Sequence, residues 1–212
     1  KLVPPGEPIV ATLDATAPCS AGATVELWLP SSSSPRTATG RRIAARVAPT
    51  ATCNTGLAAI APATGEYVVA VTTDGGTGAY GLTVDTAPTE QEPNDVNGNP
   101  LIVAGSQTYA SGTLSSGTDL DLQTFTLVTP QTIAVDLDVG GPDGPGCDVP
   151  LRLRVLRLGA TVAETIGQGG VCPRLTTPVL APGSYAVAVS SVGTPPATPT
   201  WAMSWSSGRC GD

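Results

Sequence analysis

Histidine is absent from this 212-residue sequence, and lysine occurs only once, as Lys1. Without an imidazole group, the chain cannot form a Ser-His-Asp or Cys-His catalytic arrangement, and it has no histidine ligand for zinc. Catalysis would have to depend on carboxylates, on a tyrosine, or on a lysine at the first position, where order is usually poor. We therefore expect this chain not to be an enzyme.

Charge is also scarce: charged residues make up 13% of the sequence, and the net charge is −7. The arginines are scattered, with only Arg41 and Arg42 adjacent, so the chain has no basic stripe that could follow a phosphate backbone. No apolar run approaches the ~20 residues that a membrane-spanning helix needs. We expect neither a nucleic-acid partner nor a membrane span.

The five cysteines are widely spaced and include no Cys-x-x-Cys pair, which argues against a zinc site. Widely spaced cysteines in a chain with almost no lysine favour an oxidising, extracytoplasmic compartment. The sequence begins without a methionine and without the apolar segment of a signal peptide. We expect a secreted or cell-surface location, and a chain that was processed from a longer precursor.

One sequence pattern occurs twice along the chain. Residues 65–71 (GEYVVAV) match residues 183–189 (GSYAVAV), and residues 2–15 match residues 127–139. Two cysteines and a strand candidate rich in Leu or Val lie between these matches, in the same order in both halves. An internal repeat of this kind indicates two copies of one structural unit. We interpret the chain as two tandem domains, domain 1 (1–87) and domain 2 (88–212).

The two copies differ at their front. In domain 2 the 38 residues 89–126 precede Leu127, whereas in domain 1 only Lys1 precedes the matching Leu2. Domain 1 therefore lacks the first part of the repeat. Either this part was removed from the chain, or another chain or segment supplies the missing strands.

Short alternating segments dominate both halves, as where Ile133, Val135 and Leu137 alternate with more polar residues. Gly and Pro interrupt these segments at short intervals, and none shows helical periodicity with caps. The pattern predicts an all-β fold made of two tandem antiparallel β-sandwiches. Equivalent positions in the two copies predict the disulfides Cys19–Cys53 and Cys147–Cys172, which leaves Cys210 unassigned.

Acidic residues gather at the start of domain 2, first in residues 89–100 (TEQEPNDVNGNP) and then after a Ser-Gly-Thr turn. Calcium takes six to eight oxygen ligands, several of them carboxylates, from a turn-rich backbone. Neither group supplies enough oxygens alone, so we expect the two to share one calcium ion. The alternative is a solvated linker followed by an exposed strand start. The candidate ligands are Glu90, Glu92, Asn94, Asp95, Asp119 and Asp121.

Four elements follow one another in domain 2: EPND at residues 92–95, DLDLQTF at 119–125, a set of apolar strands, and APGSYAVAV at 181–189. In this order they resemble the bacterial pre-peptidase C-terminal domain, which is related to the collagen-binding domains of clostridial collagenases. The resemblance extends to domain 1 through the repeat. It implies jelly-roll-like sandwiches that are appended to secreted proteins, often peptidases, and that are not themselves catalytic. In calcium-binding members, the two matching acidic segments share the metal.

These observations favour a non-catalytic secreted or surface module of a larger precursor, which binds an extracellular protein or polysaccharide and holds one structural calcium ion in domain 2. Two alternatives stay open. The chain could be a subunit of an extracellular filament or processed complex that another chain completes, or the C-terminal accessory or targeting region of a secreted peptidase. Trp28 is out of phase with Val25 and Leu27, so we expect it to face solvent as a ligand surface or to be covered by a neighbouring loop or domain.

Overall fold

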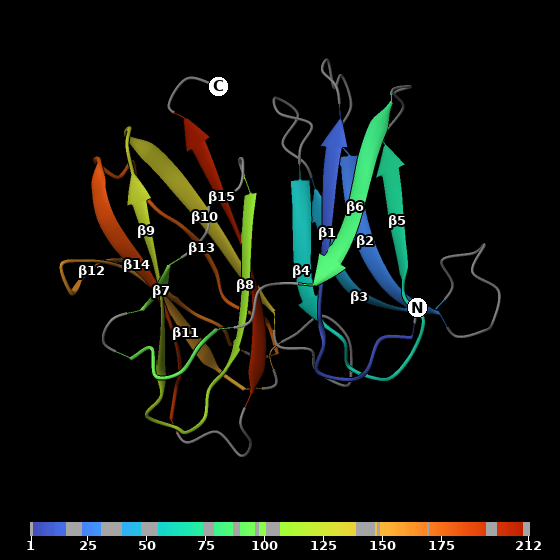
Figure 1. The fold of residues 1–212 in the computed structure, drawn as a ribbon, viewed down its shortest axis with the longest axis horizontal. Coiled ribbons are helices and arrows are strands. Elements are labelled where there is room, and N and C mark those ends of the chain that lie inside the picture. The colour runs from blue at the N-terminus through green and yellow to red at the C-terminus, as the bar shows by residue number, and fades with distance from the viewer. Residues whose placement is uncertain are drawn as a thin grey trace.

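The strands of this protein form four β-sheets, arranged as two sandwiches that lie side by side (Figure 1). The structure is a computed structural model. It describes residues 2–15, 23–30, 40–47, 55–73, 79–86, 90–95, 98–100, 107–138, 147, 149–168, 170–193 and 199–209. The described residues contain no helix, and hence none that could cross a membrane. The predicted all-β fold with two sandwich domains is confirmed.

The first sandwich, domain 1, consists of two three-stranded sheets with the orders β4-β1-β6 and β3-β2-β5. Alternate residues of each strand point between the sheets, as the period of two requires. Ile9 and Leu13 from one sheet thus meet Val25 and Leu27 from the other in one buried core. The strands are β1 (Pro8–Ala15), β2 (Ala23–Pro30), β3 (Gly40–Val47), β4 (Thr55–Ile60), β5 (Val68–Thr73) and β6 (Tyr80–Thr86).

The second sandwich, domain 2, has sheets with the orders β13-β10-β15-β8 and β12-β11-β14-β9-β7. The paired strands run antiparallel, apart from the short parallel pair of β7 with β9. Phe125, Trp201 and Trp205 are buried in its core. The strands are β7 (Asn99–Pro100), β8 (Gln107–Thr113), β9 (Leu120–Leu127), β10 (Gln131–Asp138), β11 (Leu151–Arg157), β12 (Ala160–Ile166), β13 (Arg174–Thr176), β14 (Gly183–Ser191) and β15 (Thr200–Arg209).

The strand order of domain 1 recurs in domain 2. The sheet β4-β1-β6 corresponds to β13-β10-β15, and β3-β2-β5 corresponds to β12-β11-β14. A local hydrogen bond recurs as well, because the hydroxyl of Tyr67 donates to the carbonyl of Ala63 and that of Tyr185 donates to the carbonyl of Ala181, each at 2.7 Å. The additional strands of domain 2 extend the matching edges: β8 lies beyond β15, and β9 and β7 lie beyond β14.

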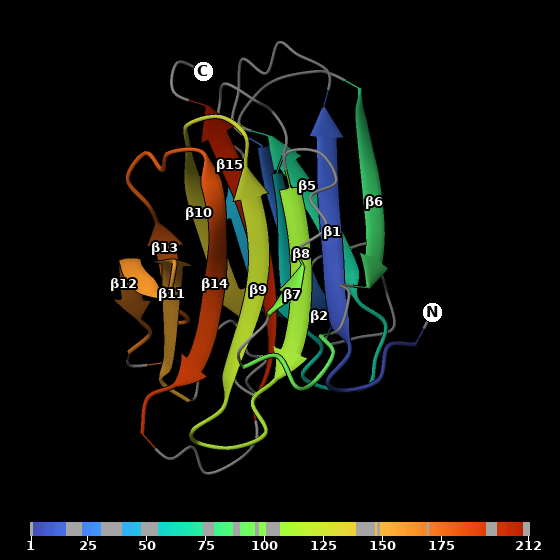
Figure 2. The same ribbon diagram turned by 60° about the vertical axis from the view of Figure 1, so that its left-hand side comes forward.

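Strands β1 and β4 are covered on both faces, whereas β6 of the same sheet is exposed. One face lines the core of domain 1, and the other packs on domain 2, where Val10, Ala58 and Ile60 meet Ala202 of β15. Figure 2 shows β1 of domain 1 next to β8 of domain 2, and the hydroxyls of Thr12 and Tyr109 on these strands are 2.9 Å apart. All six residues of β4 are consequently buried, which its sequence TGLAAI permits because none of its residues is charged. The backbone N–H of Ile60 donates to Asp138 of domain 2 at 3.0 Å. The interface thus combines apolar packing with polar contacts.

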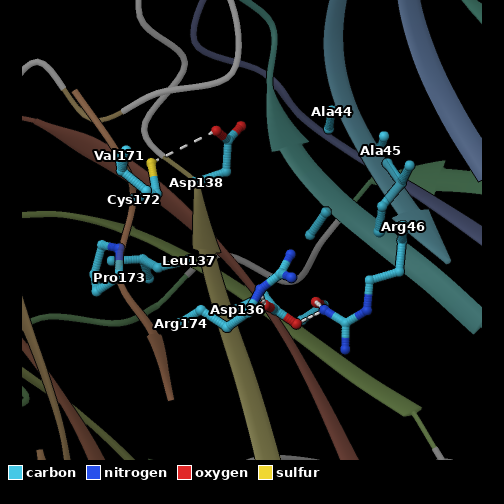
Figure 3. A pocket seen from close by; sticks show the side chains of 13 residues that line it. Ala44, Ala45, Arg46, Asp136, Leu137, Asp138, Val171, Cys172, Pro173 and Arg174 are labelled. Carbon is cyan, nitrogen blue, oxygen red and sulfur yellow. Dashed lines mark hydrogen bonds and ion pairs between the residues drawn. The ribbon is translucent and has the colours of Figure 1, made fainter. Parts of the chain in front are cut away.

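A cavity of about 420 Å³ lies at this interface, lined by residues of both domains (Figure 3). Asp136 of β10 accepts ion pairs from Arg46 of β3 and from Arg174 of β13, so its carboxylate links the two domains. Burial lowers the pKa of Arg46, and the charge of Arg174 lowers it further. The side chains of Arg46 and Asp136 are only 19% and 15% exposed, whereas that of Arg174 is 69% exposed, so the charge cluster has a buried pair and a solvated outer member.

Cys147 and Cys172 are joined by a disulfide across a sequence separation of 25, and this is the pair that the repeat predicts for domain 2. It ties the loop before β11 to the segment before β13. Closing a loop of this length stabilises the fold by about 3–4 kcal/mol in the chain-entropy model. Cys19, Cys53 and Cys210 lie outside the described residues, so the other predicted disulfide stays a prediction.

Candidate metal centre

The acidic segment 90–95 lies against the ends of β8 and β9 and is held there by hydrogen bonds. The backbone N–H of Glu90 donates to the carbonyl of Ser111 on β8 at 2.8 Å. The buried amide of Asn94 donates to the Glu90 carboxylate at 2.8 Å and accepts from the N–H of Leu122 on β9 at 3.4 Å. The segment therefore spans the two sheets of domain 2.

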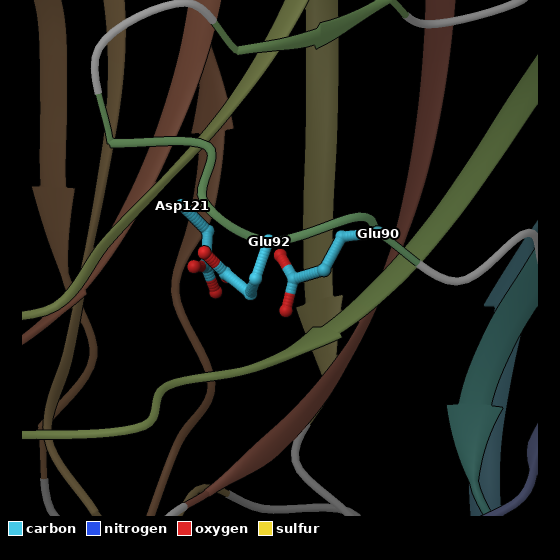
Figure 4. A group of neighbouring side chains, drawn as sticks. All are labelled: Glu90, Glu92 and Asp121. Carbon is cyan, nitrogen blue, oxygen red and sulfur yellow. The ribbon is translucent and has the colours of Figure 1, made fainter.

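This placement brings together five of the six predicted ligands in two overlapping groups. Carboxylate oxygens of Glu90, Glu92 and Asp121 lie within 4.8 Å of one another, and Figure 4 shows the three side chains converging. Carboxylate oxygens of Glu92, Asp95 and Asp119 satisfy the same limit. Glu92 belongs to both groups and is exposed, whereas Asp119 and Asp121 are buried. The two acidic stretches that the sequence places 24 residues or more apart thus form one cluster.

Asp121 occupies the innermost position of the cluster, with a relative exposure of 0%. One of its oxygens accepts a hydrogen bond from the indole N–H of Trp201 at 2.5 Å. The other oxygen, Oδ1, is buried and has no hydrogen-bond partner. A buried carboxylate oxygen without a donor is costly, and in natural proteins such an atom commonly marks an ion or water site.

The environment raises the pKa of Asp121 to about 8. Burial is the largest cause, because it disfavours the charged carboxylate, and the hydrogen bond from Trp201 opposes it. The neighbouring negative charges, chiefly that of Glu90, raise the pKa further. Without a cation, a proton on Asp121 is therefore the means by which this side chain avoids an uncompensated buried charge.

Two neighbouring carboxyl groups respond differently to their surroundings. Burial raises the pKa of Glu90, although hydrogen bonds from the N–H of Thr113 and the amide of Asn94 partly offset this effect. Burial also acts to raise the pKa of Asp119, but hydrogen bonds from the hydroxyl and the N–H of Ser115 outweigh it, so that the net shift is downward. Of these two carboxyl groups, Asp119 is thus the more readily ionised.

The cluster has no basic side chain to neutralise it within the described part of the chain. The ion pairs there join arginines to Glu26, Asp136 and Glu164, none of which belongs to the cluster. Five carboxylates and no nitrogen or sulfur donor make a ligand set of hard oxygens, which suits calcium better than zinc. The residues present therefore fit the calcium ion that the sequence predicts.

Asn94 is placed differently from the carboxylates. Its side-chain oxygen and nitrogen are both engaged, with the N–H of Leu122 and with Glu90 respectively, so that it positions a ligand and ties the segment to β9. A direct ligand role for Asn94 stays a prediction.

Sequence patterns did not indicate two residues that shape the site. Trp201 lies 80 residues from Asp121 and reaches it only through the register of β15 in the opposite sheet. Gly112 of β8 provides space, because a Cβ atom there would lie 2.3 Å from the carboxylate of Glu90. Both contacts depend on tertiary pairing, for which a single sequence carries no local signal.

Trp28, the predicted ligand surface, lies on β2 and is half-buried. Its indole N–H donates to Glu26 at 3.1 Å, and Glu26 also pairs with Arg42 at 3.0 Å. The side chain is therefore part of a polar group on the sheet β3-β2-β5. Its role in binding stays a prediction.

No protein-family model matches this chain, and no curated protein matches it by sequence. Solved structures with partial similarity to this chain include PliG of Aeromonas hydrophila, a periplasmic inhibitor of g-type lysozyme, which is 15% identical with a TM-score of 0.38 over 57% of this chain and 97% of that one. The pre-peptidase C-terminal domain of a Bacillus anthracis collagenase is 16% identical with a TM-score of 0.38, over 55% and 99% of the two chains. Function is therefore inferred from the residues of this chain.

Proposed function

We propose that this chain is a non-catalytic, extracytoplasmic binding or accessory module of a larger precursor, and that domain 2 holds one structural calcium ion. The observation that carries the metal site is the convergence of Glu90, Glu92 and Asp121, with a buried Asp121 oxygen that lacks a hydrogen-bond partner. A calcium ion would supply the missing positive charge. No residue of the cluster is assigned a catalytic role.

The expected effect of the ion is mechanical. Glu90 lies only a few residues after Thr86, where β6 ends. Its backbone N–H donates a hydrogen bond to β8 of domain 2. An ion held by Glu90, Glu92 and Asp121 would bind this segment to β9 and so reinforce the connection between the two domains. Metal affinity of this kind adds to folding stability because the unfolded chain does not assemble the site.

Thermal unfolding with and without calcium tests the site, with Glu92→Gln as the diagnostic variant. Glu92 is exposed and contributes to both carboxylate groups, so its amide analogue removes a charge with little effect on packing. The matched control is Glu164→Gln on β12, an exposed acid outside the cluster. At a calcium concentration of about 100 Kd, we expect Tm to rise on the order of 10 °C in the unmodified chain and in the control. A much smaller rise is expected in Glu92→Gln, and equal shifts in all three proteins would contradict the site.

The partner that we propose is an extracellular protein or polysaccharide, with Trp28 as the contact residue. The position of Trp28 supports this proposal, because its aromatic ring lies on a strand next to Glu26 and Arg42, whose side chains can form hydrogen bonds. Binding of soluble polysaccharides should change tryptophan fluorescence in the unmodified chain and not in Trp28→Ala. The interpretation as the C-terminal region of a secreted peptidase concerns segments beyond this chain and stays a prediction.

A further inference from the structure

The last strand of each domain occupies an equivalent position, so the two can be compared residue by residue. In domain 1, Leu13 of β1 pairs with Leu82 of β6. In domain 2, the matching Leu137 of β10 pairs with Met203 of β15. Two residues further along β6 and β15, Val84 pairs with Ala11 and Trp205 pairs with Val135. The apolar row of β6 (Tyr80, Leu82 and Val84) therefore corresponds to that of β15 (Trp201, Met203 and Trp205).

The burial of these two rows differs greatly. Trp201 and Met203 are 0% exposed and Trp205 is 2% exposed, whereas Tyr80, Leu82 and Val84 are 57%, 38% and 53% exposed. The row of β6 has core-type residues on the face that continues the core of domain 1, because Val84 and Leu82 lie beside Ala11 and Leu13. Contiguous exposed apolar surface of this kind is a candidate interaction site.

Domain 2 shows what covers such a row. Phe125 of β9 packs on Trp205 with ring centroids 5.4 Å apart, and Asp121 of β9 accepts the hydrogen bond from Trp201. β9 itself pairs with β14, and β8 pairs with β15. The cover is therefore a pair of consecutive strands, one added to each sheet.

In domain 1 the corresponding positions are sheet edges. β5, the counterpart of β14, and β6, the counterpart of β15, end their sheets among the described residues. Isolated edge strands are commonly protected by charges, prolines or bulges. β5 (VVAVTT) carries no charge and no proline, and β6 (YGLTVDT) carries only Asp85. The edges at β5 and β6 are thus adjacent and unprotected, and an exposed apolar row lies beside them. This arrangement is typical of a surface that accepts added strands.

We propose that domain 1 is completed by a donated strand pair of the same repeat type as residues 107–127 of this chain, with its first strand along β6 and its second along β5. The donated segment would carry an aromatic residue at the place of Phe125, facing Val84. Pairing of β6 alone with a second copy of this chain is disfavoured, because it would leave the β5 edge without a partner strand.

A chain that carries an additional copy of residues 90–126 directly before Leu2 tests this proposal. Leu2 matches Leu127, so the added copy enters β1 as residues 90–126 enter β10. Hydrogen–deuterium exchange is measured without calcium, which separates the result from the metal proposal. We expect exchange of the β5 and β6 amides to slow by about tenfold or more. We expect exchange of the β10 and β14 amides to stay unchanged, which would show that domain 2 remains folded.

The control is the same extended chain with Phe125→Ser in the added copy only, in which we expect most of the protection to be lost. Unchanged exchange of β5 and β6 in the extended chain would overturn the proposal. Sedimentation of the unmodified chain provides the second measurement. A monomer with rapidly exchanging β6 amides supports the proposal, and a dimer in which these amides are already protected would show that a second copy covers the edge instead.

Discussion

The indole N–H of Trp201 donates a hydrogen bond to the carboxyl group of Asp121, across the interior between the two sheets of domain 2. This contact joins β15 to β9 and fixes the inner end of the acidic cluster. It also leaves the second oxygen of Asp121 buried and directed at the cluster without a donor. This hydrogen bond therefore links the acidic cluster to a core residue of domain 2.

The first prediction concerns pH in the absence of calcium. The pKa of Asp121 is raised to about 8 in the folded state, above its ordinary value of 3.8. The folded protein thus binds this proton more tightly than the unfolded chain does. The contribution of this proton to folding stability is fully present below about pH 4 and is lost as the pH rises toward about pH 8. The free energy of unfolding should therefore fall across this window.

Urea unfolding of the metal-free chain at several pH values measures this dependence. In Asp121→Asn, the amide keeps an acceptor for Trp201 and cannot ionise, so we expect a flatter profile and a metal-free stability at pH 8 that is not below that of the unmodified chain. A profile as steep in Asp121→Asn as in the unmodified chain would assign the dependence to other groups.

The second prediction uses the space beside Glu90. A Cβ atom at Gly112 would lie 2.3 Å from the Glu90 carboxylate, which would have to leave its present position in the group with Glu92 and Asp121. We expect Gly112→Ala to weaken calcium binding by about tenfold or more, since calcium affinity depends on the number and placement of carboxylates. Gly81→Ala is the control, because a Cβ atom there meets only an ordinary contact at 3.7 Å. Equal calcium affinity of the two variants would argue against Glu90 as a ligand.

The third prediction concerns the Cys147–Cys172 disulfide. Replacing both cysteines by serine should lower the free energy of unfolding by about 3 kcal/mol, because the unfolded chain regains the freedom of the closed loop. Chemical denaturation of the double variant measures the loss. A loss below about 1 kcal/mol would show that the surrounding strands, and not the disulfide, hold the segment before β13.

The fourth prediction concerns the interface between the domains. Ala202 of β15 is fully buried against Val10, Ala58 and Ile60 of domain 1. The interface has no space for an arginine side chain at this position, so Ala202→Arg should separate the two sandwiches. We expect the radius of gyration from small-angle X-ray scattering to increase, while the circular dichroism spectrum stays that of β-sheet. Ser184→Arg on the exposed part of β14 is the control. An unchanged radius in Ala202→Arg would contradict the interface.

Much of the fold could be predicted because its signals are local. Alternation of residues such as Ile133, Val135 and Leu137 gave strands that the structure contains, with these three residues in the core. The internal repeat predicted which elements correspond, and the strand orders of the two domains agree. The buried strand β4 shows the limit of this reasoning, because the sequence TGLAAI does not reveal that its second face packs on another domain.

The candidate site could be predicted in part for the same reason. The two acidic stretches are visible as composition, and a short ligand list followed from calcium chemistry. The contributions of Trp201 and Gly112 could not be predicted, because β15, β8 and β9 are brought together only by long-range pairing. The exposed row of β6 could not be predicted either: Leu82 and Val84 have the residue types of a core, and only the sheet order shows that β6 ends its sheet among the described residues.

Isothermal titration calorimetry with calcium tests the central claim most directly. For the unmodified chain at pH 7.5, we predict one binding event per chain, and weaker binding at lower pH because protons compete for the carboxylates. Asp121→Asn and Glu92→Gln should each lose most of the affinity, and Glu164→Gln should keep it. Absence of calcium binding by the unmodified chain, or equal binding by all four proteins, would contradict the metal centre.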